Sequence, residues 1–361
     1  MNVPTVVRSL VRSTPTIAPV PHRALLSVTG SQAGEFLNGV VASSVPPSRD
    51  SHFYTAFLHA QGRVLHDAFI HSYTSPEGKR GYLIEYDSRP SEAPPLLSTL
   101  KRYVLRSKVR LRDVSDEYDV WSAWGSETEK GWETAREWVN ASSGAAEPVW
   151  KHEQESEWPW GNGPNALRDR RAVGMGHRLV VRKGDRPSQC STHDTAAEED
   201  YLLHRILHGV PEGNTDIVPM HSFPMDSNLD IMGALDFRKG CYVGQELTVR
   251  TYHTGIIRKR IFPVQIQPSI DFLSDIDIKA VNKAAPTEDS PRTRPRGTGK
   301  LLSSTQGVGL ALLRLEHVAA VEEDRASLEF DLMSSDGGSS SKYAVRPWRP
   351  DWWPSFSVNE Q

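Results

Sequence analysis

One of the two cysteines in this 361-residue chain, Cys241, lies among residues that could make its thiol chemically active. A cysteine acts as a nucleophile or metal ligand in its thiolate form, and neighbouring cations favour that form. Arg238 and Lys239 supply two cations shortly before Cys241. Gly240 and Gly244 leave room for a turn and for another molecule to approach. We therefore expect Cys241 to be a reactive or ligating thiol assisted by Lys239, and the alternative is a structural cysteine buried in a tight turn.

The same stretch carries three further polar side chains. Residues 239–246 read Lys-Gly-Cys-Tyr-Val-Gly-Gln-Glu, so Tyr242, Gln245 and Glu246 add a phenol, an amide and a carboxylate. The amide and the carboxylate follow the thiol within a few residues. We expect Gln245 and Glu246 to orient the turn or to contact a partner.

Length and composition limit the classes to which the chain can belong. Its 361 residues can form two or three domains with substantial cores, and 24% charged and 38% hydrophobic residues are ordinary for a globular protein. The formal net charge of −3 gives no overall attraction to nucleic acid. Two cysteines indicate no disulfide framework, and we expect Cys190 to be structural. No apolar run approaches the roughly 20 residues that span a bilayer, so we expect no membrane insertion.

The first 21 residues have the composition of a mitochondrial transit peptide. Four apolar residues within positions 6–11 would share one face of a helix, with Arg8 and Arg12 together on the other. No acidic residue occurs before Glu35, and prolines from position 15 onward prevent the helix from continuing. We therefore expect residues 1–21 to direct the chain to the mitochondrial matrix, and the alternative is an ordinary disordered terminus.

Strands and helices are interleaved in a way that favours an α+β fold. Apolar runs at 53–58 and 63–71, separated by a glycine-containing loop, predict a hairpin. Leu97, Leu100 and Val104 have helical spacing, and another helix is predicted after Thr195. Further strands are expected at 24–28, 81–86, 108–114 and 308–315. Hairpins mixed with helices indicate mostly antiparallel sheets rather than a doubly wound parallel sheet.

Two segments differ in character from the rest. Residues 126–165 contain five tryptophans among acidic and small residues, and we expect an insertion whose tryptophans pack on the body of the protein or contact a partner. Residues 266–296 are polar and rich in proline, which predicts a flexible insertion.

Four motifs together resemble one protein family. The stretch 239–246 is similar to the signature of the YgfZ-type folate-binding proteins, which are related to the T-protein of the glycine cleavage system. Residues 205–213 resemble the family's Arg-Ile-x-x-Gly-Ile-Pro segment, and residues 36–39 resemble its Phe-Leu-Gln-Gly. Pro224 and residues 228–230 resemble its Pro-x-x-x-Asn-Leu-Asp. The resemblance covers most of residues 22–125 and 165–265, and more weakly 297–318.

The resemblance implies the three-lobed architecture of T-protein. It has two α+β lobes with mostly antiparallel sheets and a small C-terminal β-barrel. With the segments described above, the expected organisation is a transit peptide at 1–21, a folate-binding-like domain at 22–125, the tryptophan-rich insertion at 126–165, a second α+β domain at 166–265, the flexible insertion at 266–296, and a barrel-like domain with the tail at 297–361.

The mitochondrial members of this family are iron–sulfur cluster assembly factors, so the resemblance implies a role in the maturation of [4Fe–4S] proteins in the matrix. Clusters are commonly held by four thiolates, and one well-placed cysteine cannot build a stable site alone. Cys241 would then ligate a transient or shared cluster, or act as a redox thiol, together with a partner. The implied partners are iron–sulfur scaffold or A-type carrier proteins and [4Fe–4S] client enzymes.

Two alternatives remain within the same family, and the sequence favours an assembly factor over both. One is a tetrahydrofolate-dependent aminomethyltransferase like T-protein, whose paired aspartates match a segment here in which His66 precedes Asp67. T-proteins also lack the cysteine motif. The other is a non-catalytic folate-binding scaffold. For folate, we expect Asp67, Tyr103 and Glu212 as ligands by residue type, because a pterin needs an apolar or aromatic slot with a carboxylate facing its ring.

Overall fold

The computed structural model describes residues 4–12, 14–48, 50–126, 136–150, 158–161, 166–271, 273–283, 298–333 and 340–355. The chain divides into two compact units. The larger consists of Arg12–Tyr201, Glu212–Ile257 and Trp352–Gln361, and the smaller of Met1–Val11, Leu202–Pro211 and Arg258–Asp351.

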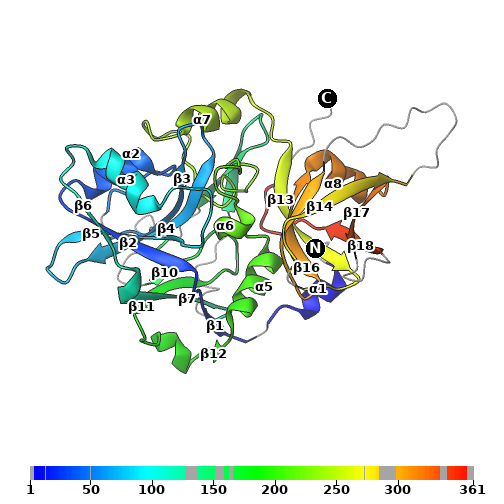
Figure 1. The fold of residues 1–361 in the computed structure, drawn as a ribbon, viewed down its shortest axis with the longest axis horizontal. Helices are drawn as coiled ribbons and strands as arrows, with labels where there is room; N and C mark the ends of the chain where they lie inside the picture. The colour runs from blue at the N-terminus through cyan, green and yellow to red at the C-terminus, as the bar shows by residue number, and fades with distance from the viewer. Residues whose placement is uncertain are drawn as a thin grey trace. The chain divides into compact units, whose positions relative to one another are not determined.

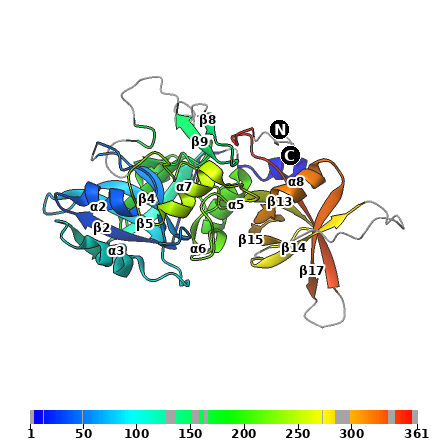
Figure 2. The same ribbon diagram turned by 90° about the horizontal axis from the view of Figure 1, so that it is seen from above.

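The first sheet of the larger unit has five antiparallel strands in the order β3-β4-β5-β2-β6. Helices α2 and α3 lie side by side against it (Figures 1 and 2). Because β2–β5 are buried along nearly their whole length, both faces of this sheet must be covered. The elements are β2 (Arg23–Thr29), α2 (Ala33–Val40), β3 (Phe53–Leu58), β4 (Val64–Thr74), β5 (Arg80–Asp87), α3 (Leu96–Val104) and β6 (Arg110–Asp113).

Alternate residues of these strands have different environments. Leu26, Ile70 and Ile84 face the two helices and form an apolar core with Leu37 and Leu100. Since successive side chains of a strand point to opposite faces, the residues between them point away from the helices. That second face carries charged residues and is described with the candidate site below.

The second sheet of the larger unit has the order β10-β11-β7-β1-β12, and only the β1–β12 pair is parallel. Its strands are β1 (Thr16–Pro19), β7 (Tyr118–Trp124), β10 (Ala166–Arg168), β11 (His177–Arg182) and β12 (Asp194–Thr195). Two 3₁₀ turns, η1 (Ser115–Glu117) and η2 (Ser188–Ser191), flank these strands in the chain. Cys190 packs against the small core of this sheet, as expected for a structural cysteine.

The N-terminal segment contributes to the fold. Thr5–Ser9 forms the short helix α1, and Val7 is buried in the core of the smaller unit. Ile17 and Ala18 on β1 are fully buried in the second sheet of the larger unit. Residues that we assigned to a transit peptide thus form part of both units, because their apolar side chains can be buried in the folded chain as well as on one face of a targeting helix.

The tryptophan-rich insertion contains a two-stranded hairpin, β8 (Arg136–Asn140) and β9 (Ala146–Trp150). Trp160 is 4% exposed and meets Trp150 edge to face, with ring centroids 6.0 Å apart. The Arg136 and Arg170 guanidinium groups lie 4.7 and 4.6 Å from the Trp150 ring centroid. The described tryptophans therefore pack on the protein, as expected, while residues 127–135 and 151–157 lie outside the described part.

The smaller unit contains a closed six-stranded barrel in the order β13-β16-β15-β14-β17-β18 (Figure 1). Leu203 and Ile206 of α5 (Glu198–His208) pack on its apolar side chains, and Gly209 ends that helix with a φ of +66°. The remaining elements are β13 (Lys259–Gln267), β14 (Ile276–Asn282), β15 (Gly299–Thr305), β16 (Val308–Arg314), α8 (Leu315–Glu322), β17 (Ala326–Met333) and β18 (Ser340–Pro347).

The predicted α+β fold with mostly antiparallel sheets and a C-terminal barrel is confirmed, but several boundaries differ. The barrel begins at Lys259 rather than at residue 297. β14 lies inside the segment 266–296 that we predicted to be flexible, because its alternation is short and surrounded by polar residues. β7, from the predicted first domain, pairs with β11 from the predicted second, so the two proposed α+β domains share a sheet.

Candidate functional site

Cys241 lies on the surface, in a loop that leads into α7 (Gln245–Thr254). The next residue, Tyr242, is 6% exposed, and Val243 packs against the core beneath α2. The side chains of Tyr242 and Val243 therefore fix the backbone of the loop, while the Cys241 side chain remains exposed. The alternative of a cysteine buried in a tight turn is wrong.

Lys239 anchors this loop to the end of α2. Its ammonium group donates hydrogen bonds to the carbonyl oxygens of Asn38, Val41 and Ser43 at 2.7–2.8 Å. Carbonyls at a helix C-terminus have no partner within the helix, and a cation there is favourable. Burial lowers the pKa of Lys239 to about 8, so it remains mainly an ammonium at neutral pH. The geometry assigns Lys239 to positioning the loop, since its three N–H groups point at carbonyls.

Two motifs that are 200 residues apart in sequence meet here. The Phe36–Gly39 segment is the last part of α2, and its Asn38 and Gly39 carbonyls accept hydrogen bonds from Lys239 Nζ and Val243 N. This contact could not be predicted from the sequence, because nothing in either stretch shows that it binds the other. The α2 terminus thus forms the base on which the cysteine loop rests.

Two glycines that leave no room for a side chain lie where the loop meets the β3–β4 hairpin. Gly244 has a φ of +81°, and a Cβ there would lie 2.4 Å from the His59 carbonyl oxygen. Gly62, in the hairpin turn, has a φ of +79°, and its Cβ would lie 2.7 Å from Leu247 Cβ. Side chains at either position would push the hairpin and α7 apart. Gln245 Oε1 accepts a hydrogen bond from Tyr242 N at 3.2 Å and so orients the turn, as expected.

The surface around the thiol is polar. Arg238 and Glu246 are exposed, as is Gly240 beside the cysteine. The Arg238 guanidinium lies 3.2 Å from a Glu147 carboxylate oxygen, and its side chain is 71% exposed. Arg238 thus supplies a largely exposed cation to this surface, and Glu246 supplies a carboxylate in the first turn of α7.

A second group of predicted residues lies in a buried cluster of charges between the two sheets of the larger unit. Glu212 Oε2 accepts hydrogen bonds from Arg178 Nη2 at 2.5 Å and from the Tyr201 hydroxyl at 2.7 Å, and it forms an ion pair with Arg171 Nη1 at 2.7 Å. Asp67 accepts a hydrogen bond from Gly213 N at 3.0 Å. The structure therefore brings Asp67 and Glu212 into one cluster, as the folate prediction requires of them.

The cluster continues across the first sheet through Glu85. Its carboxylate accepts a hydrogen bond from Arg23 Nε at 2.9 Å and lies 3.4 Å from Arg178 Nε and 2.9 Å from His71 Nε2. Burial would raise the pKa of Glu85, but Arg178, Arg23 and His71 hold it at about 2. Burial outweighs Arg23 at Asp67 and raises the pKa of that carboxyl.

Tyr103 does not join Asp67 and Glu212. It lies on α3, 38% exposed, and α3 covers the face of the first sheet opposite to the cluster. His66, which stands where T-protein has an aspartate, points to the helix-covered face beside Tyr86, and burial lowers its pKa to about 4. Sequence reasoning missed the buried partners Arg23, Glu85, Arg171 and Arg178. A usable signal was present in Glu85 and Arg178, each a charged residue inside an apolar strand.

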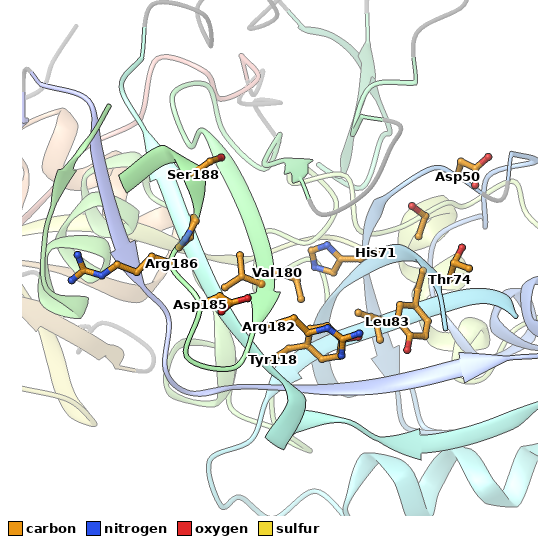
Figure 3. A pocket seen from close by; sticks show the side chains of 14 residues that line it. Asp50, His71, Thr74, Leu83, Tyr118, Val180, Arg182, Asp185, Arg186 and Ser188 are labelled. Carbon is orange, nitrogen blue, oxygen red and sulfur yellow. The ribbon is translucent and has the colours of Figure 1, made fainter. Parts of the chain in front are cut away.

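A separate cavity, lined by residues of both sheets, has a volume of about 890 Å³ (Figure 3). Its lining includes His71, Tyr118 and Arg182, and neither Asp67 nor Glu212. The Arg182 guanidinium stacks over the Tyr118 ring, 4.7 Å from its centroid.

Among the described residues, no three His, Cys, Asp or Glu side chains gather as a metal site. No helix of this part is long and apolar enough to cross a membrane.

Comparison with known proteins decides the family. The chain is 42% identical over 328 residues to the protein named iron–sulfur cluster assembly factor IBA57 homolog, mitochondrial, of Cryptococcus neoformans var. neoformans, and the match covers 84% of each chain. The chain belongs to the IBA57 family. The relatives of the same name in Pyricularia oryzae and Mycosarcoma maydis are 36% and 33% identical, over 91% and 95% of this chain and 82% and 86% of their own. The IBA57 relatives are named as mitochondrial, which confirms the predicted mitochondrial location.

Residues 258–355 match the model of the CAF17 C-terminal beta-barrel domain, in agreement with the observed barrel. The fold is similar to that of the glycine cleavage system aminomethyltransferase T of Bartonella henselae, with a TM-score of 0.61 and 12% identity over 94% of this chain and 87% of that one. The predicted T-protein-like fold of this IBA57-family chain is therefore confirmed.

Proposed function

We propose that this protein is an iron–sulfur cluster assembly factor of the mitochondrial matrix, needed for maturation of [4Fe–4S] proteins, and that it acts through Cys241 with a partner. The family of its relatives supports the general role. The observation that carries the specific role is the exposed thiol on an immobilised loop. A thiol that must meet a cluster held by another protein has to be accessible and correctly oriented before the encounter.

The chain contains only two cysteines, and Cys190 packs in the second sheet. Because a cluster commonly needs four thiolates, the remaining ligands of a cluster at Cys241 come from the partner. Arg238 would contribute positive charge beside an anionic thiolate-ligated cluster, and Glu246 would pair with a cation of the partner. An iron–sulfur scaffold or an A-type carrier has the chemistry that this surface requires, and [4Fe–4S] enzymes are the clients.

The residues predicted for tetrahydrofolate do not fit that ligand as a set. One Glu212 carboxylate oxygen already accepts two hydrogen bonds and pairs with Arg171, and Tyr103 lies on the other side of the sheet. We derive no step through folate. We propose that a folate-dependent aminomethyl transfer is not the main activity, and titration of the full chain with tetrahydrofolate, comparing Asp67→Asn and Tyr103→Phe, tests this. Saturable binding lost in both variants would contradict it.

The decisive experiment replaces the endogenous protein with variants at matched levels and measures [4Fe–4S] and [2Fe–2S] enzyme activities in mitochondria. Cys241→Ser should lower [4Fe–4S] activities about as far as absence of the protein does, because serine is a poor ligand for soft metals and has no thiol chemistry. Cys190→Ser is the matched control and should retain activity. Full [4Fe–4S] activity with Cys241→Ser would refute the thiol mechanism. Loss of glycine cleavage with normal iron–sulfur enzymes would favour the transferase.

A further inference from the structure

A strongly basic surface covers one edge of the first sheet, far along the chain from the cysteine loop. It is formed by the β4–β5 turn, the end of α3 and the loop into β6, and we call it the basic patch. Its members are exposed cations that form no ion pair with any described residue, namely Lys79, Arg80, Arg102, Arg106, Lys108 and Arg110. In a chain with a net charge of −3, such a concentration of unpaired positive charge is not explained by composition.

The patch contains a concave site. Lys79, Arg80, Lys108 and Arg110 line a cavity of about 730 Å³ together with the hydroxyl-bearing Thr29, Ser31 and Ser107, and its lining includes no acidic residue. Glu77, on the same turn, accepts a hydrogen bond from Ser75 and lies outside the lining. Four cations and several hydroxyl donors around one hollow match the oxygens of a phosphate group.

An exposed apolar residue lies two positions before Ser107, which lines this hollow. Leu105 is 87% exposed, the highest value among the large hydrophobic residues that the structure describes, and its φ of 44° is unusual for a residue other than glycine. Tyr103, two residues earlier, is 38% exposed. An apolar and an aromatic side chain surrounded by cations are what a peripheral protein presents to an anionic bilayer.

The loop that presents Leu105 is held firmly. Ser107 N donates to the Val104 carbonyl at 2.7 Å, and Lys108 N donates to Gln32 Oε1 at 2.7 Å. Gly30, with a φ of +130°, lets the Lys108 carbonyl approach so closely that a Cβ would lie 2.2 Å from it. The exposure of Leu105 therefore results from a fixed backbone, and this backbone holds an energetically unfavourable conformation at the centre of the basic patch.

We propose that the basic patch docks this protein on the surface of an anionic phospholipid membrane, with lipid phosphates in the cavity and Leu105 inserted at the headgroup boundary. Charge alone would also suit an acidic protein. The exposed leucine and the hollow lined by cations and hydroxyl groups favour the membrane, because a bilayer offers phosphate groups next to an apolar layer. The docking requires no membrane-spanning segment and is independent of the function proposed for Cys241.

Co-sedimentation of the full chain with vesicles tests the proposal. We expect binding to phosphatidylcholine vesicles that contain phosphatidylglycerol, none to phosphatidylcholine alone, and weakening with added salt. Arg102→Glu/Arg106→Glu should lower the partition coefficient roughly 25-fold or more, since each cation near an anionic surface contributes about fivefold. Leu105→Ser should lower it several-fold. Arg346→Glu and Ile256→Ser, at exposed positions outside the patch, are matched controls and should bind normally.

Three results would overturn the proposal. The first is equal binding of the double variant and the unmodified chain to anionic vesicles. The second is saturable binding of inorganic pyrophosphate without vesicle binding, which would identify a site for free phosphate compounds. The third is loss of an acidic protein partner in the double variant without any vesicle binding by the unmodified chain, which would identify a protein interface.

Discussion

The cysteine loop and the buried charge cluster show opposite uses of reactive residue types within one folded unit. The cluster contains many ionisable groups, and Arg178 and Glu85 are completely buried in it as an ion pair, with Nε and Oε1 3.4 Å apart. The loop has a single thiol at the surface, and it is fixed by the neutral carbonyls that Lys239 contacts. A high density of charge thus indicates a structural centre here, whereas the available chemistry lies at one exposed atom.

The reason is the cost of burying charge. Each buried ion loses several kcal/mol of hydration, which neighbouring opposite charges must offset. Charges that compensate one another in this way have a structural role. Cys241 carries no such requirement, because the interactions that fix its loop are made by other residues, and the thiol remains accessible to a partner.

The strongest test of this contrast is to break the cluster. Arg178→Met should lower the free energy of unfolding by about 3–5 kcal/mol, because Glu85 and Glu212 are left buried without their shared cation. Urea denaturation followed by circular dichroism measures the change. Arg182→Met, on the same strand and 54% exposed, is the control and should cost less than about 1 kcal/mol. Similar losses in both variants would mean that the cluster is not a structural centre.

The dependence of stability on pH extends the comparison to His66, a buried ionisable group on the opposite face of the same sheet. Burial lowers the pKa of His66 to about 4 from its usual 6.5, so the folded state excludes a proton that the unfolded state binds. Its contribution is complete above pH 6.5 and is lost as the pH falls to 4, with about 1.4 kcal/mol per pKa unit, or roughly 3 kcal/mol. His66→Leu should therefore flatten the decline in stability between pH 6.5 and 4. An unchanged slope would show that other groups cause the decline.

A smaller loss of stability is expected when the anchor of the cysteine loop is removed. Lys239→Met removes three hydrogen bonds to the carbonyls at the end of α2 and should cost about 2 kcal/mol. Hydrogen exchange should accelerate at the amides of residues 239–246. Lys101→Met, at an exposed position of α3, is the control. If exchange in the loop were unaffected, Lys239 would not be the anchor.

Substitution of Cys241 should have the smallest effect on stability, although it should have the largest effect on function. Cys241→Ser should change the free energy of unfolding by less than about 0.5 kcal/mol, because the side chain is exposed and buries no surface. Thermal denaturation of the unmodified and variant chains measures this. A loss above about 2 kcal/mol would show that the thiol also has a packing role, and the separation between the two regions would then fail.

The fold class, the family and the importance of the cysteine loop could be predicted from the sequence alone. Hairpin turns, helical spacing and the octapeptide 239–246 are local features, and local features can be recognised from the sequence alone. The sequence also placed Asp67 and Glu212 among candidate residues, although it could not show that they share a cluster.

Tertiary structure decided everything that depends on contacts between distant segments. Lys239 was expected to assist the thiol, and only its proximity to Asn38 reveals an anchor. β14 and β1 were not recognised as parts of sheets, because their burial comes from partners elsewhere in the chain. The basic patch arises only when the β4–β5 turn is folded beside the loop that follows α3. The charge and apolar pattern of a segment limit the structures it can form. The pairing of segments that are far apart in the sequence decides which residues become buried and which stay on the surface.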